Sequence, residues 1–294
     1  MFHNAPMKAF VLAFVTFVFA ASAAEPLPAQ RIVFLGDSIT YGGQYVVDFS
    51  CWLAVEHSSV KVLNLGLGSE TVSGLSEEGH AGGKFPRPSI HERLERVLRA
   101  TRPDLVIACY GMNCGIYLPF DEGRFSKFRD GMTRLHNEVI RSGANIIHLT
   151  PPVYDSHGEQ PSYDEVLERY SAWLLQQRAK GWQVIDVHGW MKQRLMERRR
   201  KDPSFTFSRD RIHPNKEGHR VIAQPLLAYF GGTEAPADTV ELRKLVEKRM
   251  ILLRDAWLTA TGHKRPGVAS GLPLSEAEKQ AAELTKQIAA LLGR

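Results

Sequence analysis

The chain has 294 residues, of which 44% are hydrophobic and 23% charged, and its formal net charge is +5. These values are typical of a soluble globular protein with an ample core, long enough for one large domain with an appendage. The basic excess is concentrated in residues 192–201, where no aromatic residues are interleaved. A solvated helix face explains such a run better than a nucleic-acid site, so we expect no nucleic-acid partner.

Residues 1–24 are typical of a secretory signal peptide. Lys8 precedes the apolar run 9–20, and small residues at A-x-A spacing follow at 21–24. The run is too short to span a bilayer, and no charged stop-transfer segment follows it. We therefore expect cleavage near residue 24, a secreted or periplasmic protein, and no membrane span afterwards. The alternative is an uncleaved anchor.

The three cysteines, Cys51, Cys109 and Cys114, match no disulfide framework and no metal site. An odd number leaves at least one thiol free or paired between chains. Buried, inert thiols are the default interpretation. We expect neither a metal nor another cofactor.

Strand and helix signals alternate along the next two hundred residues. Short apolar runs predict strands at residues 31–35, 60–65, 105–110, 145–150 and 183–186. Helical spacing predicts helices at 45–56, 90–100, 125–141, 163–180 and 192–201, and one from 215 that Pro225 should kink or break. The connection from Gly66 to Pro88 is long and rich in Gly, Pro and His, as functional or disordered loops are.

This alternation predicts an α/β fold, a three-layer α/β/α sandwich around a five-stranded parallel flavodoxin-like sheet. We divide the chain into a signal peptide (1–24), a catalytic domain (25–232) and a C-terminal helical extension (233–294). In the extension we expect a helix at 241–258, a link at 261–273, and a last helix to 292 that starts with a capping box at Ser275–Glu278. A stripe on this last helix should pack back on the domain, and it comprises Ala277, Ala281, Leu284, Ile288 and Leu291.

A candidate nucleophile follows the first strand. Gly36, Asp37 and Ser38 form a sharp turn there, at the edge where parallel sheets place their ligands. A serine hydroxyl needs a base, and the base needs a partner that orients it. Asp210 and His213, three positions apart on one loop after the last strand, supply such a pair.

Acyl transfer also needs hydrogen-bond donors for the oxyanion. Candidates follow the second and third strands. Residues 64–71 offer backbone N–H groups in a tight turn, and residues 111–113 offer the side-chain amide of Asn113.

Together these four stretches resemble the SGNH hydrolase (GDSL esterase/lipase) superfamily, whose motifs match residues 36–40, 64–71, 111–113 and 210–213 in the same order. The resemblance covers about residues 30–230. It implies Ser38 as nucleophile, His213 as base and Asp210 as its support. It also implies an oxyanion hole formed by the N–H of Ser38, an N–H at Ser69 or Gly68, and the Asn113 amide.

Two positions depart from the pattern of this superfamily. Ser69 stands where a glycine is usual, and it can serve if its backbone conformation allows, because the donor is its N–H. Cys114 stands where an aspartate usually follows Asn113. Cys114 is a poor alternative nucleophile, because no base is evident beside it.

Together with the export signal, the resemblance implies a secreted serine esterase that removes small acyl groups, above all acetyl, from carbohydrate, with a small-molecule or polysaccharide ester as its substrate. One alternative is a lipase, arylesterase or thioesterase with the same machinery. Another is a catalytically inactive carbohydrate-binding relative, against which the intact Ser, Asp, His and Asn set argues. The oligomeric state, the acyl group and the sugar stay open.

Overall fold

Five parallel strands form one sheet in the order β2-β1-β3-β4-β5. The computed structural model describes residues 29–158, 162–232 and 240–294. The strands are β1 (Arg31–Gly36), β2 (Lys61–Asn64), β3 (Leu105–Cys109), β4 (Asn145–Leu149) and β5 (Gln183–Ile185). The prediction of a flavodoxin-like parallel sheet is confirmed. The central strand β3 is buried along its whole length, because helices cover both faces of the sheet.

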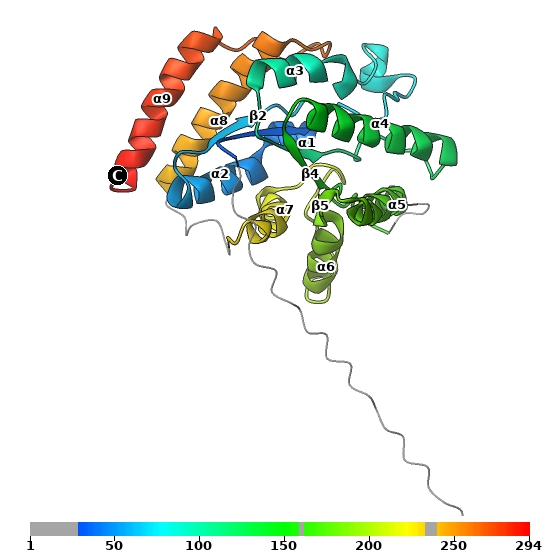
Figure 1. Ribbon diagram of the computed structural model, residues 1–294. Coiled ribbons are helices and arrows are strands. Elements are labelled where there is room, and N and C mark those ends of the chain that lie inside the picture. Colours follow the sequence, from blue (N-terminus) through cyan, green and yellow to red (C-terminus); the bar gives the residue numbers. More distant parts are fainter. Residues whose placement is uncertain (1–28, 159–161, 233–239) are drawn as a thin grey trace, which may run out of the picture.

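Helices cover the two faces of the sheet and form the outer layers of the sandwich. Helices α3 and α4 lie on one face, and α2 and α7 lie on the other (Figure 1). The α-helices are α1 (Ser38–Gly42), α2 (Gln44–Glu56), α3 (Leu94–Thr101), α4 (Glu122–Arg141), α5 (Tyr163–Gln176), α6 (Val187–Arg199), α7 (Lys216–Tyr229), α8 (Val240–Thr261) and α9 (Leu274–Leu291). Short 3₁₀ helices are η1 (His80–Gly83), η2 (Ile90–Glu92) and η3 (Gln177–Lys180).

One helix continues past the position where a kink or a break was predicted, and one predicted cap does not form. Helix α7 continues through Pro225 to Tyr229. Burial of Leu226 and Leu227 holds its last turns in place, and such packing outweighs a single missing N–H donor. The capping box at Ser275 does not form, because α9 starts one residue earlier and Pro273 precedes it as the N-cap.

The C-terminal helices pack against the sheet domain, as predicted. Helix α8 lies along the edge strand β2 and against α2, and α9 packs on α8 (Figure 1). The interface is apolar and joins Val47, Cys51 and Ala54 of α2 to Leu242, Val246, Met250 and Ile288. The stripe of α9 is buried except Leu291, which is 43% exposed because it lies in the last turn. A helix beside an edge strand also blocks pairing with another chain.

The signal peptide and the boundary between the domain and its extension lie outside the described residues. In the part of the chain that the structure covers, no helix is long and apolar enough to cross a membrane. All three cysteines are buried thiols, in agreement with the prediction.

We predict that residues 239–294, expressed alone, do not unfold cooperatively. Helix α8 packs on α2 and β2 as well as on α9, so the isolated pair of helices loses much of its packing and cannot bury a core of its own. Circular dichroism during heating should show a broad, non-cooperative change, whereas the full chain should give a sharp transition. A sharp melt of the isolated segment would contradict this packing argument.

Candidate active site

The candidate site lies where strand order reverses, at the carboxyl edge of β1 and β3. Parallel sheets of this order leave a crevice at that point, because the connections from the two strands run to opposite faces. The register places Gly36 opposite Cys109 and Phe34 opposite Asn64, so the ends of β1, β2 and β3 are neighbours. Three of the four predicted stretches are therefore brought to one place.

The turn after β1 presents Ser38 at the start of α1. Asp37 caps this helix, because its carboxylate accepts a hydrogen bond from the N–H of Ile39 at 3.0 Å. Gly36 is required by close approach, since a Cβ at this position would lie 2.7 Å from the carbonyl oxygen of Cys109. Ser38 itself is half-buried, and its hydroxyl is accessible.

Ser38, His213 and Asp210 form one chain of hydrogen bonds. The Ser38 Oγ lies 2.8 Å from the His213 Nε2, and the His213 Nδ1 lies 2.6 Å from the Asp210 Oδ2. The other carboxylate oxygen of Asp210 accepts the N–H groups of His213 and Ile212. Burial raises the pKa of Asp210, but the hydrogen bonds from His213 and Ile212 outweigh it and lower the pKa overall. Asp210 therefore stays ionised and orients the imidazole.

A buried aspartate holds the loop that carries His213. Asp155 is 4% exposed and accepts two hydrogen bonds from Arg199, at 2.7 and 2.8 Å, and one from Thr206 at 2.7 Å. Its N–H also donates to the carbonyl oxygen of Arg211. These bonds join the loop after β4 to the loop before α7, which fixes the position of His213, the candidate base, relative to the sheet.

The turn after β2 carries the two candidate backbone donors, Gly68 and Ser69. Glu70 donates its N–H to the Leu67 carbonyl oxygen at 3.2 Å, so Gly68 and Ser69 occupy the middle of a tight turn. Ser69 has φ +65°, the left-handed value for which glycine is preferred at this point of a turn. Among the described residues, neither Gly68 nor Ser69 donates its N–H to an acceptor.

Two contacts bring this turn to the Ser38 turn. The Leu67 N–H donates to the Gly36 carbonyl oxygen at 2.9 Å, and the Asn64 amide donates to the Thr40 carbonyl oxygen at 2.6 Å. Gly66 must be a glycine, because a Cβ there would lie 2.4 Å from the Tyr41 nitrogen.

The Asn113 amide is buried and fully oriented. Its Oδ1 accepts hydrogen bonds from Arg87 Nη1 at 2.9 Å and from the Tyr117 hydroxyl at 2.8 Å. Its Nδ2 donates to the Glu70 carbonyl oxygen at 3.3 Å and keeps a second N–H. Cys114, at the position of the usual aspartate, accepts the Val72 N–H at its sulfur. Burial raises the Cys114 pKa to about 11, which disfavours a thiolate nucleophile.

A buried ion pair between Glu70 and Arg93 supports the two stretches that carry the candidate oxyanion donors, residues 64–71 and 111–113. Glu70 and Arg93 have fully buried side chains and share two hydrogen bonds of 2.7 Å. Tyr110 donates its hydroxyl to the same carboxylate at 2.7 Å, and Arg93 also donates to the Leu65 carbonyl oxygen. Burial raises the pKa of Glu70, and the Arg93 charge opposes this shift.

The C-terminal extension also reaches this edge. Arg254 of α8 donates to the Tyr41 carbonyl oxygen at 2.7 Å, with its guanidinium 3.9 Å from the ring centroid of Tyr41. Arg265, on the link to α9, lies against Gly68, where a Cβ would come 3.0 Å from its Nε. The extension therefore supports the turns that carry Ser38 and Ser69.

Sequence analysis missed Arg87, Tyr117, Glu70, Arg93 and the two arginines of the extension. The length of the 66–88 connection marked the region of Glu70 and Arg87 as a functional or disordered loop, and Glu70 also lies in the predicted donor stretch 64–71, but neither signal selected these side chains. Their roles depend on contacts between distant segments.

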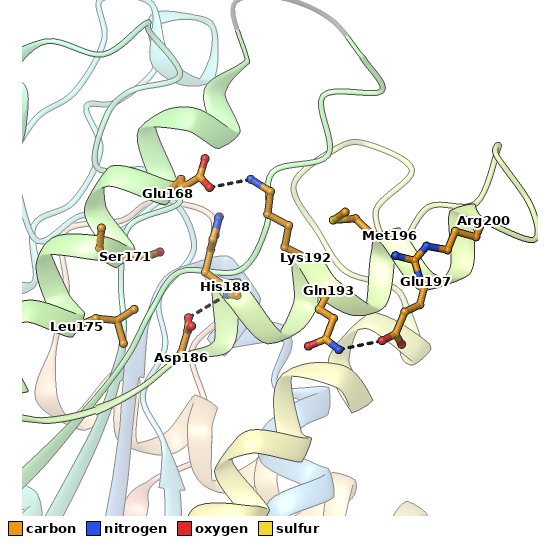
Figure 2. A pocket seen from close by; sticks show the side chains of 12 residues that line it. Glu168, Ser171, Leu175, Asp186, His188, Lys192, Gln193, Met196, Glu197 and Arg200 are labelled. Atoms are coloured by element: carbon orange, nitrogen blue, oxygen red, sulfur yellow. Dashed lines mark hydrogen bonds and ion pairs between the residues drawn. The ribbon is translucent and has the colours of Figure 1, made fainter. Parts of the chain in front are cut away.

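A separate pocket of about 490 Å³ lies between α5 and α6 (Figure 2). It is lined by both apolar and charged side chains, and Lys192 reaches Glu168 at 3.1 Å across it. None of its lining residues belongs to the four stretches around Ser38. Within the described ranges, no cluster of His, Cys, Asp and Glu side chains could hold a metal ion.

The buried carboxyl group of Asp37 should make the free energy of unfolding depend on pH. Burial raises its pKa from 3.8 to about 7, against the opposing effects of the Ile39 N–H and the His213 charge. Since the folded pKa exceeds the unfolded one, its contribution to stability is present below pH 4 and is lost as the pH rises through 7.

We therefore predict that Asp37→Asn gains stability relative to the wild type between about pH 4 and 7, and that the difference levels off above this range. Asparagine keeps the oxygen that caps α1. Urea unfolding of both proteins over this range measures the difference, and the other buried carboxyl groups cancel in it. A difference that does not change with pH would contradict the buried state of Asp37.

The fold is shared with solved structures of enzymes. A gut microbial diltiazem-metabolizing enzyme has a TM-score of 0.55 and 23% sequence identity, over 71% of this chain and 48% of that chain, so the present chain spans about half of its length. A catalytic mutant of Axe2, an acetylxylan esterase from Geobacillus stearothermophilus, has a TM-score of 0.54 and 20% identity, over 71% of this chain and 97% of that chain. Another Axe2 structure has a TM-score of 0.53 and 21% sequence identity, over 69% of this chain and 94% of that chain.

No curated protein matches the chain. A sequence model of the GDSL-like lipase/acylhydrolase family, however, matches residues 34–221, which include Ser38, Asn113, Asp210 and His213. This range covers the sheet domain and leaves out α8 and α9. The resemblance inferred from the four motifs is thereby confirmed: the chain is an acylhydrolase of the GDSL-like lipase/acylhydrolase family.

Proposed function

We propose that this protein is a serine esterase that removes small acyl groups, above all acetyl, from carbohydrate. The observation that carries the proposal is the hydrogen-bonded chain from Ser38 through His213 to Asp210, with distances of 2.8 and 2.6 Å. A hydroxyl in contact with an imidazole that a carboxylate orients is the arrangement that activates serine for acyl transfer.

The reaction follows from these contacts in two halves. His213 Nε2 takes the proton of Ser38 as Oγ attacks the ester carbonyl, and the same proton then goes to the departing alcohol. Water hydrolyses the acyl-enzyme by the same steps, again with His213 as base, and restores Ser38. The oxyanion accepts hydrogen bonds from the N–H groups of Ser38 and Ser69 and from the Asn113 Nδ2.

The surface supports a small acyl group. A long acyl chain needs a contiguous apolar surface beside the nucleophile. The large apolar side chains that are most exposed in the described part of the chain are Leu118, Ile140, Met196, Val240, Ile251, Leu272 and Leu291. Apart from Val240 and Ile251, which are both on α8, they lie on separate elements, and only Leu118 follows a strand end that carries residues of the site.

Carbohydrate as the alcohol is supported by Axe2, which shares the fold and is an acetylxylan esterase. Export supports it as well, since polysaccharides lie outside the cell. The signal peptide at 1–24 is part of this proposal, and these residues lie outside the described ones.

The first test measures hydrolysis of p-nitrophenyl esters from acetate to octanoate, together with release of acetate from acetylated xylan. We expect turnover to be highest for acetate and to fall with chain length. A preference that increases with chain length would instead favour a lipase. Measurement of acetate release from the polysaccharide decides whether carbohydrate is accepted.

Ser38→Ala should lower kcat by at least about 10⁴-fold, because Ser38 and His213 act as one unit. The fold should persist, since only a half-buried hydroxyl is removed. Ser59→Ala is the matched control, because Ser59 is exposed and precedes β2, at the opposite end of that strand from the site. This variant should behave as the wild type. Wild-type turnover by a folded Ser38→Ala protein would end the serine mechanism.

Substitutions at Ser69 and Asn113 test the oxyanion donors. If the Ser69 N–H is the donor, Ser69→Ala keeps most activity, and Ser69→Gly also raises stability by about 1 kcal/mol because φ +65° no longer strains the chain. Asn113→Ala should lower kcat by about 10²–10³-fold. If Ser69→Ala lost as much activity as Asn113→Ala, the Ser69 hydroxyl would contact the substrate and Gly68 would be the better candidate for the donor.

A further inference from the structure

Two donors of different kinds meet on the Asn113 side-chain oxygen. Arg87 reaches it with one guanidinium nitrogen and Tyr117 with its hydroxyl, at 2.9 and 2.8 Å. An amide oxygen has two lone pairs, so both are used. The amide therefore has one orientation, in which its Nδ2 cannot exchange places with its Oδ1.

Arg87 is held rigidly on the opposite side. Its guanidinium makes a two-pronged ion pair with Glu77, at 2.5 and 2.6 Å, and its own N–H donates to Ser76. The side chain is only 6% exposed. The hydrogen bonds and charge of Arg87 lower the pKa of Glu77 in spite of partial burial, so the pair stays ionised. The fixed Arg87 guanidinium therefore donates to Asn113 without a change of conformation.

The backbone is strained at the segment that carries the second donor, the Tyr117 hydroxyl. Ile116 and Tyr117 have φ of +51° and +57°, and left-handed backbone is costly for non-glycine residues and especially for a β-branched one such as Ile116. The segment turns back so that the Tyr117 hydroxyl meets Asn113, four residues earlier. The Tyr117 ring packs on Tyr163, with 4.9 Å between centroids, and lies below the Arg87 guanidinium.

We propose that Arg87 and Tyr117 are positioning residues that clamp the Asn113 amide so that one N–H of its Nδ2 is aimed at the oxyanion. This inference rests on the proposed esterase function and deepens it. No free energy is needed to orient the Asn113 amide during the reaction, because the amide is already fixed before substrate binds. The bond from charged Arg87 also withdraws electron density from the amide, which makes the Nδ2 N–H a stronger donor.

A merely structural role makes a different prediction. If the contacts only held the 111–117 segment in place, their loss would reduce activity in any background, and it would affect substrate binding as much as turnover. If they act through Asn113, their loss should lower kcat alone, and only while Asn113 is present.

The decisive variant is Tyr117→Phe, which removes one hydroxyl and leaves the aromatic packing intact. Kinetics on p-nitrophenyl acetate should show kcat about tenfold lower and KM little changed, since one hydrogen bond to the amide is lost. In the Asn113→Ala background, Tyr117→Phe should cause no further loss. Arg87→Lys keeps the charge but loses the two-pronged geometry, and it should lower kcat at least as much.

Tyr154→Phe is the matched control. Tyr154 belongs to the same aromatic cluster, with its ring centroid 6.1 Å from that of Tyr117. In the part of the chain that the structure describes, its hydroxyl makes no hydrogen bond to Asn113, so kcat should be unchanged.

A second measurement does not depend on turnover. The side-chain amide signal of Asn113, assigned in a ¹⁵N spectrum by its absence from Asn113→Ala, should shift in Tyr117→Phe and stay in place in Tyr154→Phe. An unmoved signal, or kcat losses that add to those of Asn113→Ala, would overturn the clamp. If the wild type showed no Ser38-dependent esterase activity, the proposed function would fail, while the shift of the amide signal would still test the clamp.

Discussion

The parallel pairing of β1 with both β2 and β3 is the constraint on which the rest of the site depends. It brings three strand ends to one edge, where the Ser38 turn lies between the Ser69 turn and Asn113. Close approach follows from this pairing, which is why Gly36 and Gly66 have no room for a side chain. The fourth stretch, with Asp210 and His213, arrives from a loop that Asp155 ties to the end of β4.

Buried residues hold the exposed groups of the candidate site in place for the proposed ester hydrolysis. Ser38, His213 and Asp210 are accessible to solvent, whereas the residues that support the donor stretches are buried or half-buried and hydrogen-bonded. Glu70 and Arg93 stabilise the Ser69 turn, and Arg87 and Tyr117 orient Asn113. Buried ion pairs contribute little net stability, and holding catalytic dipoles in place is a physical reason to keep them.

The extension adds to this support from outside the region that the family model matches. Helix α8 covers the edge strand β2, and Arg254 and Arg265 contact Tyr41 and Gly68, which lie beside the candidate nucleophile and oxyanion donor.

The sequence by itself determined the features that depend on neighbours along the chain. Apolar runs marked the strands, glycine marked the turn before Ser38, and the three-residue spacing of Asp210 and His213 marked the base and its partner. Motif order was enough to identify the superfamily. Where local signals competed with packing they failed, as at Pro225, whose helix is held by buried leucines, and at Ser275, which lies inside the first turn of α9. Only the tertiary structure decided which side chains orient the donors. Ser38 and His213 are 175 positions apart, and Arg87 and Asn113 are 26 apart. No local pattern encodes such contacts, because they exist only once the sheet has brought its strand ends together.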